Sequence, residues 1–365
     1  MSNHGGPTWL IERSLTPLAA AERERLLQNP AFGRVFTDHM ATIRYTEGRG
    51  WHEAKIAPRG DFTLHPATLA FHYAQEIFEG LKAYRLADGG AALFRPGANA
   101  RRFHHSAHRL AMAPLPDELF LESVRALVRV DRDWIPEAEG AALYLRPFML
   151  AIEALLAVKP SIDYLYCVVA SPVGSYFSPG ASAVTLWVSE YYTRAAPGGT
   201  GDAKCGGNYA ASLAAQAEAV REGCDQVVFL DAVERRWVEE LGGMNVFFVF
   251  DDGSLQTPPL TGTILPGVTR DSLIVLARGL GLTVREAPYA IDAWQADAAS
   301  GRLREAFACG TAAVVTPIGK VKGRKHHFTI GDGGAGVVTG RLKAALLDIQ
   351  QGRAPDPHGW LDRLF

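Results

Sequence analysis

Apolar residues recur at two different spacings in the second half of the chain. Five short runs are rich in β-branched and aromatic residues, which favours buried strands. They cover residues 183–192, 226–231, 245–250, 282–289 and 305–318. The segments between and after them repeat apolar residues at helical spacing, which predicts helices.

Three helices are predicted in this half. The first spans residues 209–221, with Asn208 in position to cap its N-terminus. Its predicted apolar face consists of Ala210, Leu213, Ala217 and Val220. The second, residues 271–280, follows a Pro-Gly turn. The third, at about residues 340–351, is expected to pack against the second domain.

The first half mixes shorter elements. Residues 61–85 predict a strand, a helix and a turn, and residues 121–130 have helical spacing. Residues 141–152 and 163–173 are strand-like runs with many aromatic and β-branched side chains.

The regular pattern stops at residues 174–184, where glycine, proline and serine accumulate. Because 365 residues are too many for one comfortable core, we place a domain boundary in this loop. The prediction is a smaller N-terminal α/β domain over residues 1–173 and a larger C-terminal domain over residues 185–365. The predicted fold class is α+β, with two unequal sheets.

Charge and cysteine content argue against several classes of partner and site. The formal net charge is -2 and no basic stripe occurs, so neither nucleic acid nor an anionic membrane is an expected partner. The first residues lack a secretory signal pattern, and no apolar run approaches the roughly 20 residues that span a bilayer. The four cysteines are scattered without a CxxC motif. We therefore expect a cytoplasmic protein without disulfides or a metal site.

The most unusual segment is residues 198–213, which has Lys204 among glycines just before a predicted helix. Glycine lets a ligand approach the backbone closely, and a lysine held there can attack a carbonyl group as an amine. The alternative is a solvated loop lysine without a function.

Two adjacent carboxylates, Glu239 and Glu240, precede a Gly-Gly turn and a buried strand. Since side chains alternate along a strand, we expect only one of the two to point inward. An inward carboxylate needs a partner, such as a protonated pyridine nitrogen. The alternative is an ion pair with Arg235 or Arg236.

Within residues 264–281, a Pro-Gly turn leads directly into a helix N-terminus with backbone N–H groups at Val268 and Thr269. Such a terminus can bind phosphate, although it can equally be an ordinary capped helix. Thr311 follows a glycine at the end of a strand and offers a hydroxyl group. The candidate arginines for pairing with a phosphate are Arg95, Arg101 and Arg102.

In their order along the chain, these segments resemble the branched-chain aminotransferases, which are fold-type IV enzymes that use pyridoxal 5'-phosphate (PLP). The likeness covers almost the whole chain and is carried by several motifs. They are FGRVFTDHM, LHPATLAFHYAQEIFEGLKAYR, LYLRP, SPVGSYF, GGTGDAKCGGNYAASL, VEELGGMN, LPGVTRDSL, ACGTAAVVTP and DIQQGRAPDPHGW. The resemblance implies PLP between a smaller and a larger domain, and a homodimer whose partner subunit helps to close the pocket. It also implies amino transfer from leucine, isoleucine or valine to 2-oxoglutarate.

The resemblance assigns roles to single residues. Lys204 matches the lysine that forms the internal Schiff base and, once freed, moves the substrate proton. Tyr209 matches the tyrosine at the phenolate oxygen, and Glu240 matches the carboxylate at the pyridine nitrogen. Arg102 matches the phosphate-binding arginine. The phosphate cup is completed by Val268, Thr269 and Thr311.

Substrate contacts are implied in the same way. The pocket positions of the family are here Phe32, Tyr73, Phe78, Tyr144, Arg146, Tyr176 and Ala312. Tyr73, Tyr144 and Arg146 are available to the distal carboxylate of glutamate. Backbone N–H groups at Thr311 and Ala312 are expected to meet the α-carboxylate.

Two features depart from the mammalian members of the family. Ala313 and Thr316 replace their redox CxxC motif, so no thiol switch is expected. Gly243 stands where they have a threonine, and the resulting GGMN motif is similar to the actinobacterial members.

Two other interpretations stay open at this point. Another fold-type IV enzyme, a D-amino-acid aminotransferase or an aminodeoxychorismate lyase, would share the lysine and the phosphate cup but not LYLRP, SPVGSYF and GGTGDAKCGGNY together. A non-catalytic protein with this fold would be expected to lack Lys204 or Glu240, and both are present.

Overall fold

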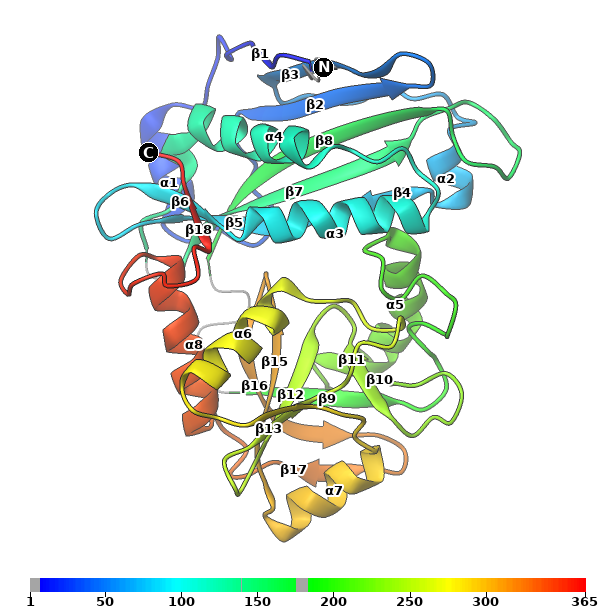
Figure 1. Ribbon diagram of the computed structural model, residues 1–365, viewed down its shortest axis with the longest axis vertical. Coiled ribbons are helices and arrows are strands. Elements are labelled where there is room, and N and C mark those ends of the chain that lie inside the picture. Colours follow the sequence, from blue (N-terminus) through cyan, green and yellow to red (C-terminus); the bar gives the residue numbers. More distant parts are fainter. Residues whose placement is uncertain (1–6, 139, 175–182) are drawn as a thin grey trace, which may run out of the picture. The chain divides into compact units, whose positions relative to one another are not determined.

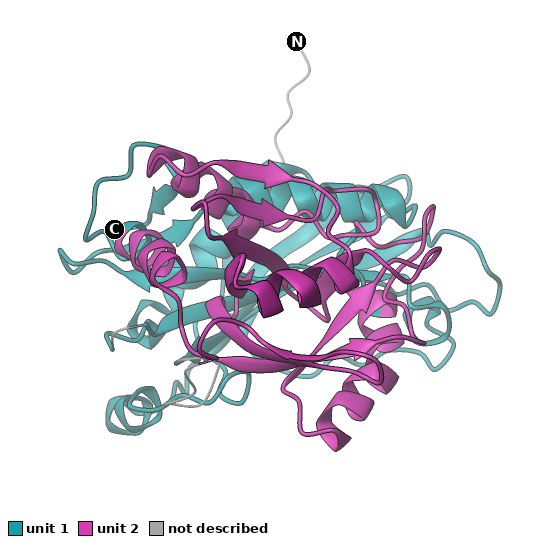
Figure 2. Ribbon diagram, turned by 90° about the horizontal axis from the view of Figure 1, so that it is seen from below, with its two compact units in different colours: residues 1–176, 203–206, 349–365 teal, residues 177–202, 207–348 magenta. Residues whose placement is uncertain are grey.

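The computed structural model describes residues 7–138, 140–174 and 183–365 (Figure 1). The chain forms two compact units, each built on its own β-sheet (Figure 2). The first unit comprises residues 1–176, 203–206 and 349–365, and the second comprises residues 177–202 and 207–348. Helices and mixed sheets occur in both, which confirms the α+β class.

The sheet of the first unit is almost entirely antiparallel. Its strands, in spatial order, are β1 (Leu10–Ile11), β3 (Gly50–Pro58), β2 (His39–Thr46), β8 (Asp163–Val173), β7 (Ala142–Ala151), β5 (Leu81–Arg85), β6 (Ala91–Phe94) and β18 (Leu361–Arg363), with β4 (Glu76–Phe78) beside β7. The pairing of β1 with β3 is parallel. The helices are α1 (Ala20–Leu27), α2 (Leu69–Tyr73), α3 (Pro96–Arg109) and α4 (Asp117–Val130), followed by the 3-10 helix η1 (Arg132–Trp134).

Helix α4 packs its apolar face onto the sheet of the first unit. Phe120, Val124 and Leu127 recur at helical spacing and are buried, and the helix contacts β2, β3 and β8. The helix predicted at residues 121–130 is confirmed and begins earlier, at Asp117, where an acidic side chain favours a helix start. In Figure 1, α3 and α4 lie side by side along this sheet.

The two long strand-like runs of the first half are confirmed as β7 and β8, which pair as antiparallel neighbours. The prediction for residues 61–85 is wrong in one respect, because the strands follow the helix instead of preceding it. Before α2 the chain forms a turn, in which the Thr68 hydroxyl donates to the His65 carbonyl over 2.6 Å. After α2, both β4 and β5 pair with β7.

The sheet of the second unit mixes parallel and antiparallel pairs. Its strands, in spatial order, are β11 (Val238–Leu241), β10 (Gln226–Leu230), β9 (Val184–Ser189), β16 (Val314–Lys322), β15 (Leu303–Gly310), β12 (Asn245–Phe250), β13 (Leu255–Thr257) and β14 (Val284–Glu286), with β17 (His327–Thr329) beside β16. Strand β9 runs parallel to both of its neighbours. The helices are α5 (Gly206–Arg221), α6 (Val268–Gly279), α7 (Ile291–Ser300) and α8 (Val337–Gln350).

The expectation of two unequal sheets is wrong, because each sheet has nine strands among the described residues. Strands β11, β13 and β17 have only three or four residues each, too few for a periodic pattern. The run at residues 305–318 also contains two strands instead of one, since the chain turns back after Gly310 and pairs it with Val314.

Helix α5 differs from its prediction at its start. It begins at Gly206, so Asn208 lies inside the first turn and is not the N-cap. The Asn208 amide nitrogen donates to the Thr200 carbonyl, and its amide oxygen accepts from the Thr200 hydroxyl, both over 2.7 Å. The side chain therefore ties the helix to the preceding loop.

The predicted apolar face of α5 is also wrong, because all four of its residues are exposed. Leu213 is 65% and Val220 is 64% accessible. The buried positions include Ser212, Ala215 and Ala219. These small side chains let the helix approach the large apolar residues of β9 and β10 closely, so size and not hydrophobicity decides which face is buried.

The other two predicted helices are present as α6 and α8. Each begins three residues before the predicted start, at Val268 instead of 271 and at Val337 instead of 340. The apolar face of α6 is confirmed, since Leu273, Ile274 and Ala277 are buried.

Two short segments beyond the predicted domain boundary at residues 174–184 belong to the first unit. Residues 349–365 belong to the first unit, because β18 pairs with β6. Residues 203–206 also belong to it, because the Phe78 N–H donates to the Lys204 carbonyl. Most of the predicted interdomain loop, residues 175–182, lies outside the described residues.

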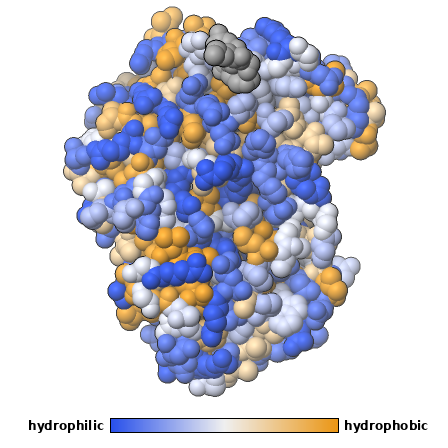
Figure 3. All heavy atoms as spheres, in the orientation of Figure 1, coloured by the Kyte–Doolittle hydropathy of each residue, from blue (hydrophilic) through white to orange (hydrophobic). Residues whose placement is uncertain are grey.

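In the described part of the chain, no helix has both the length and the apolar character needed to span a bilayer. On the face shown in Figure 3, hydrophobic side chains are interspersed with hydrophilic ones. The four cysteines are buried and unpaired.

Lys82 in β5 is a buried cation, with 3% of its surface exposed. Burial disfavours the ammonium form and lowers the pKa of Lys82 to about 8. Below pH 8 both the folded and the unfolded chain carry this proton, so stability does not change with pH through this group. From pH 8 up to about 10.4, the unfolded value, the folded state binds fewer protons and stability rises with pH.

We expect the free energy of unfolding of the unmodified protein to rise between pH 8 and pH 10 relative to that of Lys82→Met, by up to about 3 kcal/mol, because only the unmodified protein loses a proton from this site on folding. Urea unfolding at pH 7 and pH 10 measures both proteins, with Lys55→Met at an exposed position of β3 as the matched control. A difference between the two proteins that stays the same at both pH values would contradict the lowered pKa.

Candidate functional site

The described residues predicted to act on cofactor or substrate are divided between the two units. The first unit holds Phe32, Tyr73, Phe78, Arg102, Tyr144, Arg146 and Lys204. The second holds Tyr209, Glu240, Val268, Thr269, Thr311 and Ala312. Tyr176 lies outside the described residues.

Lys204 stands two residues before α5 and is held by its own peptide groups. Its N–H donates to the Ser106 hydroxyl of α3 over 2.9 Å, and its carbonyl accepts from the Phe78 N–H over 3.0 Å. Ser106 is fully buried. The Lys204 Nζ lies 4.7 Å from the centre of the Phe78 ring. The backbone of the lysine is thus fixed to α3 and β4 of the first unit.

Arg102 of α3 forms a buried, two-pronged ion pair with Glu79. Its Nε and Nη2 donate to the two carboxylate oxygens over 2.6 and 2.8 Å. Asn99 and the Gly80 N–H also donate to the carboxylate, over 2.8 and 3.0 Å. Burial tends to raise the pKa of Glu79, but Arg102 and, more weakly, Lys204 and Asn99 hold it below its usual value.

Glu79 was not predicted as a site residue, although the sequence contains a signal for it. A carboxylate inside the apolar run IFEGLKAY must be paired, because an isolated buried charge is costly. Nothing in the local sequence identifies its partner, which comes from a helix that follows two strands later.

An aromatic and cationic cluster surrounds Phe78. The Arg146 guanidinium lies 4.7 Å from the centre of the Phe78 ring and donates to the Tyr144 hydroxyl over 2.9 Å. Tyr144 and Arg146 are two residues apart in β7 and so share one face of the strand. The Phe32 ring meets the Tyr144 ring edge-on at 5.1 Å. The structure therefore brings Phe32, Phe78, Tyr144 and Arg146 together.

Glu76 joins the same cluster and was not predicted. Its carboxylate accepts from the Gly206 N–H, and an added Cβ at Gly206 would collide with it at 2.0 Å. Burial raises the pKa of Glu76, against the lowering effects of the Gly206 N–H and Arg146. The buried Nε of Arg146 has no hydrogen-bond partner among the described residues.

Tyr73 lies at the end of α2 and is not part of this cluster. Its hydroxyl donates to the Leu156 carbonyl over 2.8 Å, and the side chain is 39% exposed. Among the described residues, no hydrogen bond or ring contact links Tyr73 to Phe78 or Arg146.

In the second unit, Glu240 of β11 is buried, with 2% exposure. One carboxylate oxygen lies 2.7 Å from Nη1 of Arg194 and accepts from the Leu265 N–H over 2.9 Å. The alternative of an ion pair with Arg235 or Arg236 is therefore wrong. Arg194 was not predicted, because it lies far from Glu240 in the sequence, before β10. The fold of the sheet brings the two residues together.

Glu239 is buried as well, so the expectation that only one of the two carboxylates points inward is wrong. Its carboxylate accepts from the Thr263 hydroxyl over 2.5 Å. Burial is the main effect that raises the pKa of Glu239. Both faces of β11 are buried. Side chains alternate between a buried and an exposed face only in a strand that has one face in solvent.

The start of α6 is linked to the same region by Asn245. The Asn245 amide donates to the Leu265 carbonyl over 3.0 Å, two residues before the N-cap Gly267. An added Cβ at Gly267 would lie 2.0 Å from the Asn245 side-chain oxygen, so any larger residue would displace the Asn245 amide. No side chain caps the helix. Val268 and Thr269 therefore form an N-terminus whose first N–H groups have no capping side chain.

Tyr209 of α5 lies next to the loop that carries Gly243. An added Cβ at Gly243 would meet the Tyr209 ring at 3.6 Å, an ordinary contact distance. A methyl group at position 243 would therefore pack against this ring without a clash.

Thr311 and Ala312 lie in the turn between β15 and β16. This turn ends at Val314, whose φ of 59° is in the left-handed region. For a β-branched residue this conformation is strained, and such strain is typical of functional loops. Ala313 and Thr316, which replace the CxxC motif, are buried.

Comparison with known proteins gives consistent results. A model of the amino-transferase class IV family matches residues 76–321. A probable branched-chain-amino-acid aminotransferase of Streptomyces coelicolor is 55% identical over 98% of this chain and 99% of its own length. The branched-chain-amino-acid aminotransferase of Mycobacterium tuberculosis is 53% identical over 99% of each chain.

Solved structures are similar over the same length. The branched-chain amino acid aminotransferase of Escherichia coli has a TM-score of 0.75 at 30% identity and covers 89% of this chain and 100% of its own. The branched-chain amino acid aminotransferase of Thermobaculum terrenum, solved in its PLP form, has a TM-score of 0.71 at 26% identity and covers 90% of this chain and 98% of its own. Sequence and structure therefore agree that this chain belongs to the class IV aminotransferase family, whose members depend on PLP.

Proposed function

We propose that this chain is a branched-chain aminotransferase, which transfers the amino group of L-leucine, L-isoleucine or L-valine to 2-oxoglutarate with PLP as cofactor. The names of relatives that are 55% and 53% identical along nearly their whole length support this substrate class. The structural observation that carries the proposal is the fixed backbone of Lys204 within the segment AKCGGNY.

The groups present in each unit fit PLP. The first unit supplies the Lys204 amine for the aldehyde and the buried Arg102 guanidinium for the phosphate. The second unit supplies the buried Glu240 carboxylate for the pyridine nitrogen. It also supplies the start of α6, where the Asn245 side chain packs directly against Gly267 and the N–H groups suit phosphate.

Bound PLP supplies an electron-withdrawing ring that acidifies the Cα proton of an amino acid. We assign Lys204 as the base that takes this proton and, in the second half-reaction, returns a proton to the Cα atom of the new amino acid. Because Ser106 and Phe78 hold the lysine backbone, the origin of its side chain is fixed before the substrate arrives.

We assign Glu240 to hold a proton at the pyridine nitrogen and Tyr209 to bind the phenolate oxygen. Arg194 and the Leu265 N–H fix one Glu240 oxygen in place and stabilise its charged form. Arg102, Val268, Thr269 and Thr311 are assigned to the phosphate.

The substrate side is assigned to the cluster around Phe78. Phe32, Phe78 and Tyr144 offer an aromatic wall that suits an aliphatic side chain. Arg146 has a buried Nε without a partner and can pair with the distal carboxylate of glutamate. The α-carboxylate is assigned to backbone N–H groups at Thr311 and Ala312. Tyr73 and Tyr176 keep the role that the family resemblance gives them.

We further propose that the enzyme acts in the cytoplasm as a homodimer. Support for this setting comes from bacterial branched-chain-amino-acid aminotransferases that match this chain along nearly their whole length. The formal net charge of -2 gives no electrostatic reason to expect nucleic acid as a partner. No helix in the described residues is long and apolar enough to span a bilayer.

The absorption spectrum of the purified protein tests the activity first. We expect the visible band of lysine-bound PLP to fade on addition of L-leucine, to return with 2-oxoglutarate and to ignore D-alanine. Lys204→Ala should abolish the band shift, whereas the exposed Lys159→Ala should retain it. A band that responds to D-alanine instead would support a D-amino-acid aminotransferase, and a protein that binds no PLP would support the non-catalytic alternative.

Arg146→Ala should separate the two half-reactions. Loss of a charge-assisted hydrogen bond of about 1.5–3 kcal/mol should lower kcat/KM for glutamate at least about tenfold. The value for leucine should change less than about threefold, since its side chain carries no charge. Steady-state assays with both substrates measure this ratio, with the exposed Arg44→Ala as control. An equal loss for glutamate and leucine would remove Arg146 from this role.

Glu79→Gln should leave the buried Arg102 charge uncompensated. Breaking such a pair typically costs about 3–5 kcal/mol, so the PLP-free variant should unfold at a lower temperature. Added PLP should then raise the melting temperature of the variant more than that of the unmodified protein, because its phosphate replaces the lost negative charge. Thermal unfolding with and without PLP measures both effects, and the exposed Glu118→Gln is the control. An equal gain from PLP in both proteins would argue against phosphate binding at Arg102.

A further inference from the structure

Glu76 of β4 is a half-buried carboxylate on the sheet face that carries the proposed substrate cluster. Side chains directly opposite in paired strands share a face, as do side chains two residues apart in one strand. In the pairing of β4 with β7, Phe78 lies opposite Phe148, so Glu76, Phe78 and Arg146 project from the same face. Ile77 points the other way and is fully buried in the core.

The Glu76 carboxylate is the acceptor for the first N–H group of α5. It accepts from Gly206, the first residue of the helix, although the two residues are 130 positions apart in the sequence. A helix start leaves its first N–H groups without partners inside the helix and favours negative charge. An added Cβ at Gly206 would collide with the carboxylate, so strand and helix meet closely here. Glu76 thus caps α5 from a distant strand.

Strand β4 therefore holds the segment that carries Lys204 at two points. The Phe78 N–H donates to the Lys204 carbonyl over 3.0 Å, and the Glu76 side chain accepts from Gly206, two residues after Lys204. Tyr209 follows three residues after Gly206, in the first turn of α5. The chain between Lys204 and Tyr209 is thus anchored near its middle by Glu76.

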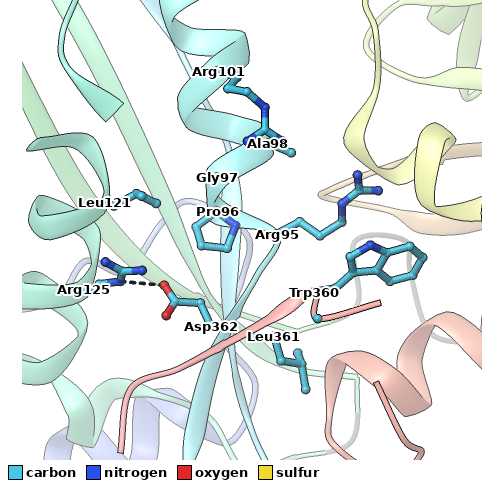
Figure 4. Close-up of a pocket in the computed structure, with 11 residues that line it drawn as sticks. Arg95, Pro96, Gly97, Ala98, Arg101, Leu121, Arg125, Trp360, Leu361 and Asp362 are labelled. Carbon is cyan, nitrogen blue, oxygen red and sulfur yellow. Dashed lines mark hydrogen bonds and ion pairs between the residues drawn. The ribbon is translucent and has the colours of Figure 1, made fainter. Parts of the chain in front are cut away.

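The alternative role for Glu76 is that of a counter-ion for Arg146. In a direct pair of the first unit, the Asp362 carboxylate accepts from the Arg125 Nε over 2.7 Å (Figure 4). Among the described residues, Glu76 forms no such hydrogen bond or ion pair with Arg146. Burial raises the pKa of Glu76, and the Gly206 N–H counteracts it more than Arg146 does. The contacts therefore favour the helix over the arginine as the partner of this carboxylate.

We propose that Glu76 is a positioning residue, which fixes the turn between Lys204 and Tyr209 by accepting the Gly206 hydrogen bond. The inference rests on the proposed function, because it takes Lys204 as the base and Tyr209 as the partner of the phenolate oxygen. The aldehyde and the phenolate oxygen are neighbouring substituents of the PLP ring. An amine and a hydroxyl that serve them need a fixed spacing, and Glu76 acts on that spacing without a contact of its own to the cofactor.

Hydrogen exchange tests the anchor without an assay of activity. In Glu76→Ala the Gly206 N–H loses its acceptor, so amides of residues 203–209 should exchange at least about tenfold faster than in the unmodified protein. Glu76→Gln keeps a side-chain oxygen that can accept, so exchange should stay within about threefold of the unmodified protein. Mass spectrometry of peptides from the full-length, PLP-loaded protein, before substrate is added, measures both. Unchanged exchange in Glu76→Ala overturns the proposal.

The first half-reaction gives a second measurement. The rate at which L-leucine makes the visible band of lysine-bound PLP fade should fall at least about tenfold in Glu76→Ala, with the apparent Kd of leucine changed less than about threefold. A misplaced amine slows proton transfer more than it weakens substrate binding. Glu76→Gln should recover the rate to within about threefold. The matched controls are Glu47→Ala and Glu47→Gln, at an exposed position between β2 and β3.

The pair of variants also separates positioning from neutralisation of Arg146. If Glu76 were the counter-ion, Glu76→Gln would be as damaging as Glu76→Ala and the loss would be confined to glutamate, which overturns the proposal. If Glu76→Ala does not fold, Gly206→Ala keeps the test valid, because its methyl group would displace the carboxylate and should speed exchange in the same segment. An unmodified protein that ignores leucine would contradict the proposed function, whereas the exchange rates still decide the role of Glu76.

Discussion

Each unit buries a carboxylate against a guanidinium, and the proposed chemistry depends on both pairs. Desolvating two charges is costly, and their attraction offsets the cost only when further hydrogen bonds satisfy the remaining atoms. Glu79 meets this condition through Arg102, Asn99 and the Gly80 N–H. Glu240 meets it through Arg194 and the Leu265 N–H. Since every donor has a place in the surrounding fold, neither pair can shift without moving the helix or loop that carries its partner.

In the second unit this constraint extends along the backbone. Leu265 donates to Glu240 through its N–H, and its carbonyl accepts from Asn245. Two residues later, Gly267 begins α6 with the Asn245 side chain directly against it. The position of the carboxylate and the start of the helix are therefore set by the same short segment of chain. A cofactor that binds a carboxylate at one end and a helix start at the other requires such a fixed spacing.

The sequence predicted those parts of the fold and the site that depend on local patterns. The apolar runs of β7, β8 and β12 and the glycine-rich segment around Lys204 can be recognised without the structure. The partners of buried charges could not be predicted, because Arg194 reaches Glu240 only after several strands have assembled. The buried face of α5 was also missed, since close packing selects Ala215 over the more hydrophobic Leu213. Local pattern thus identified the chemical groups, and tertiary packing determined what each group contacts.

The path of the chain through the first unit has a consequence for synthesis. The ribosome completes residues 207–348, almost the whole second unit, before it makes residues 349–365, which carry β18. Until then, one side of β6 lacks the partner strand that pairs with it in the folded protein. Although most of the first unit is synthesised first, its sheet cannot be completed until the C-terminal segment has been made. During that interval β6 is an open sheet edge, the kind of surface that promotes aggregation, and the return of the chain closes it.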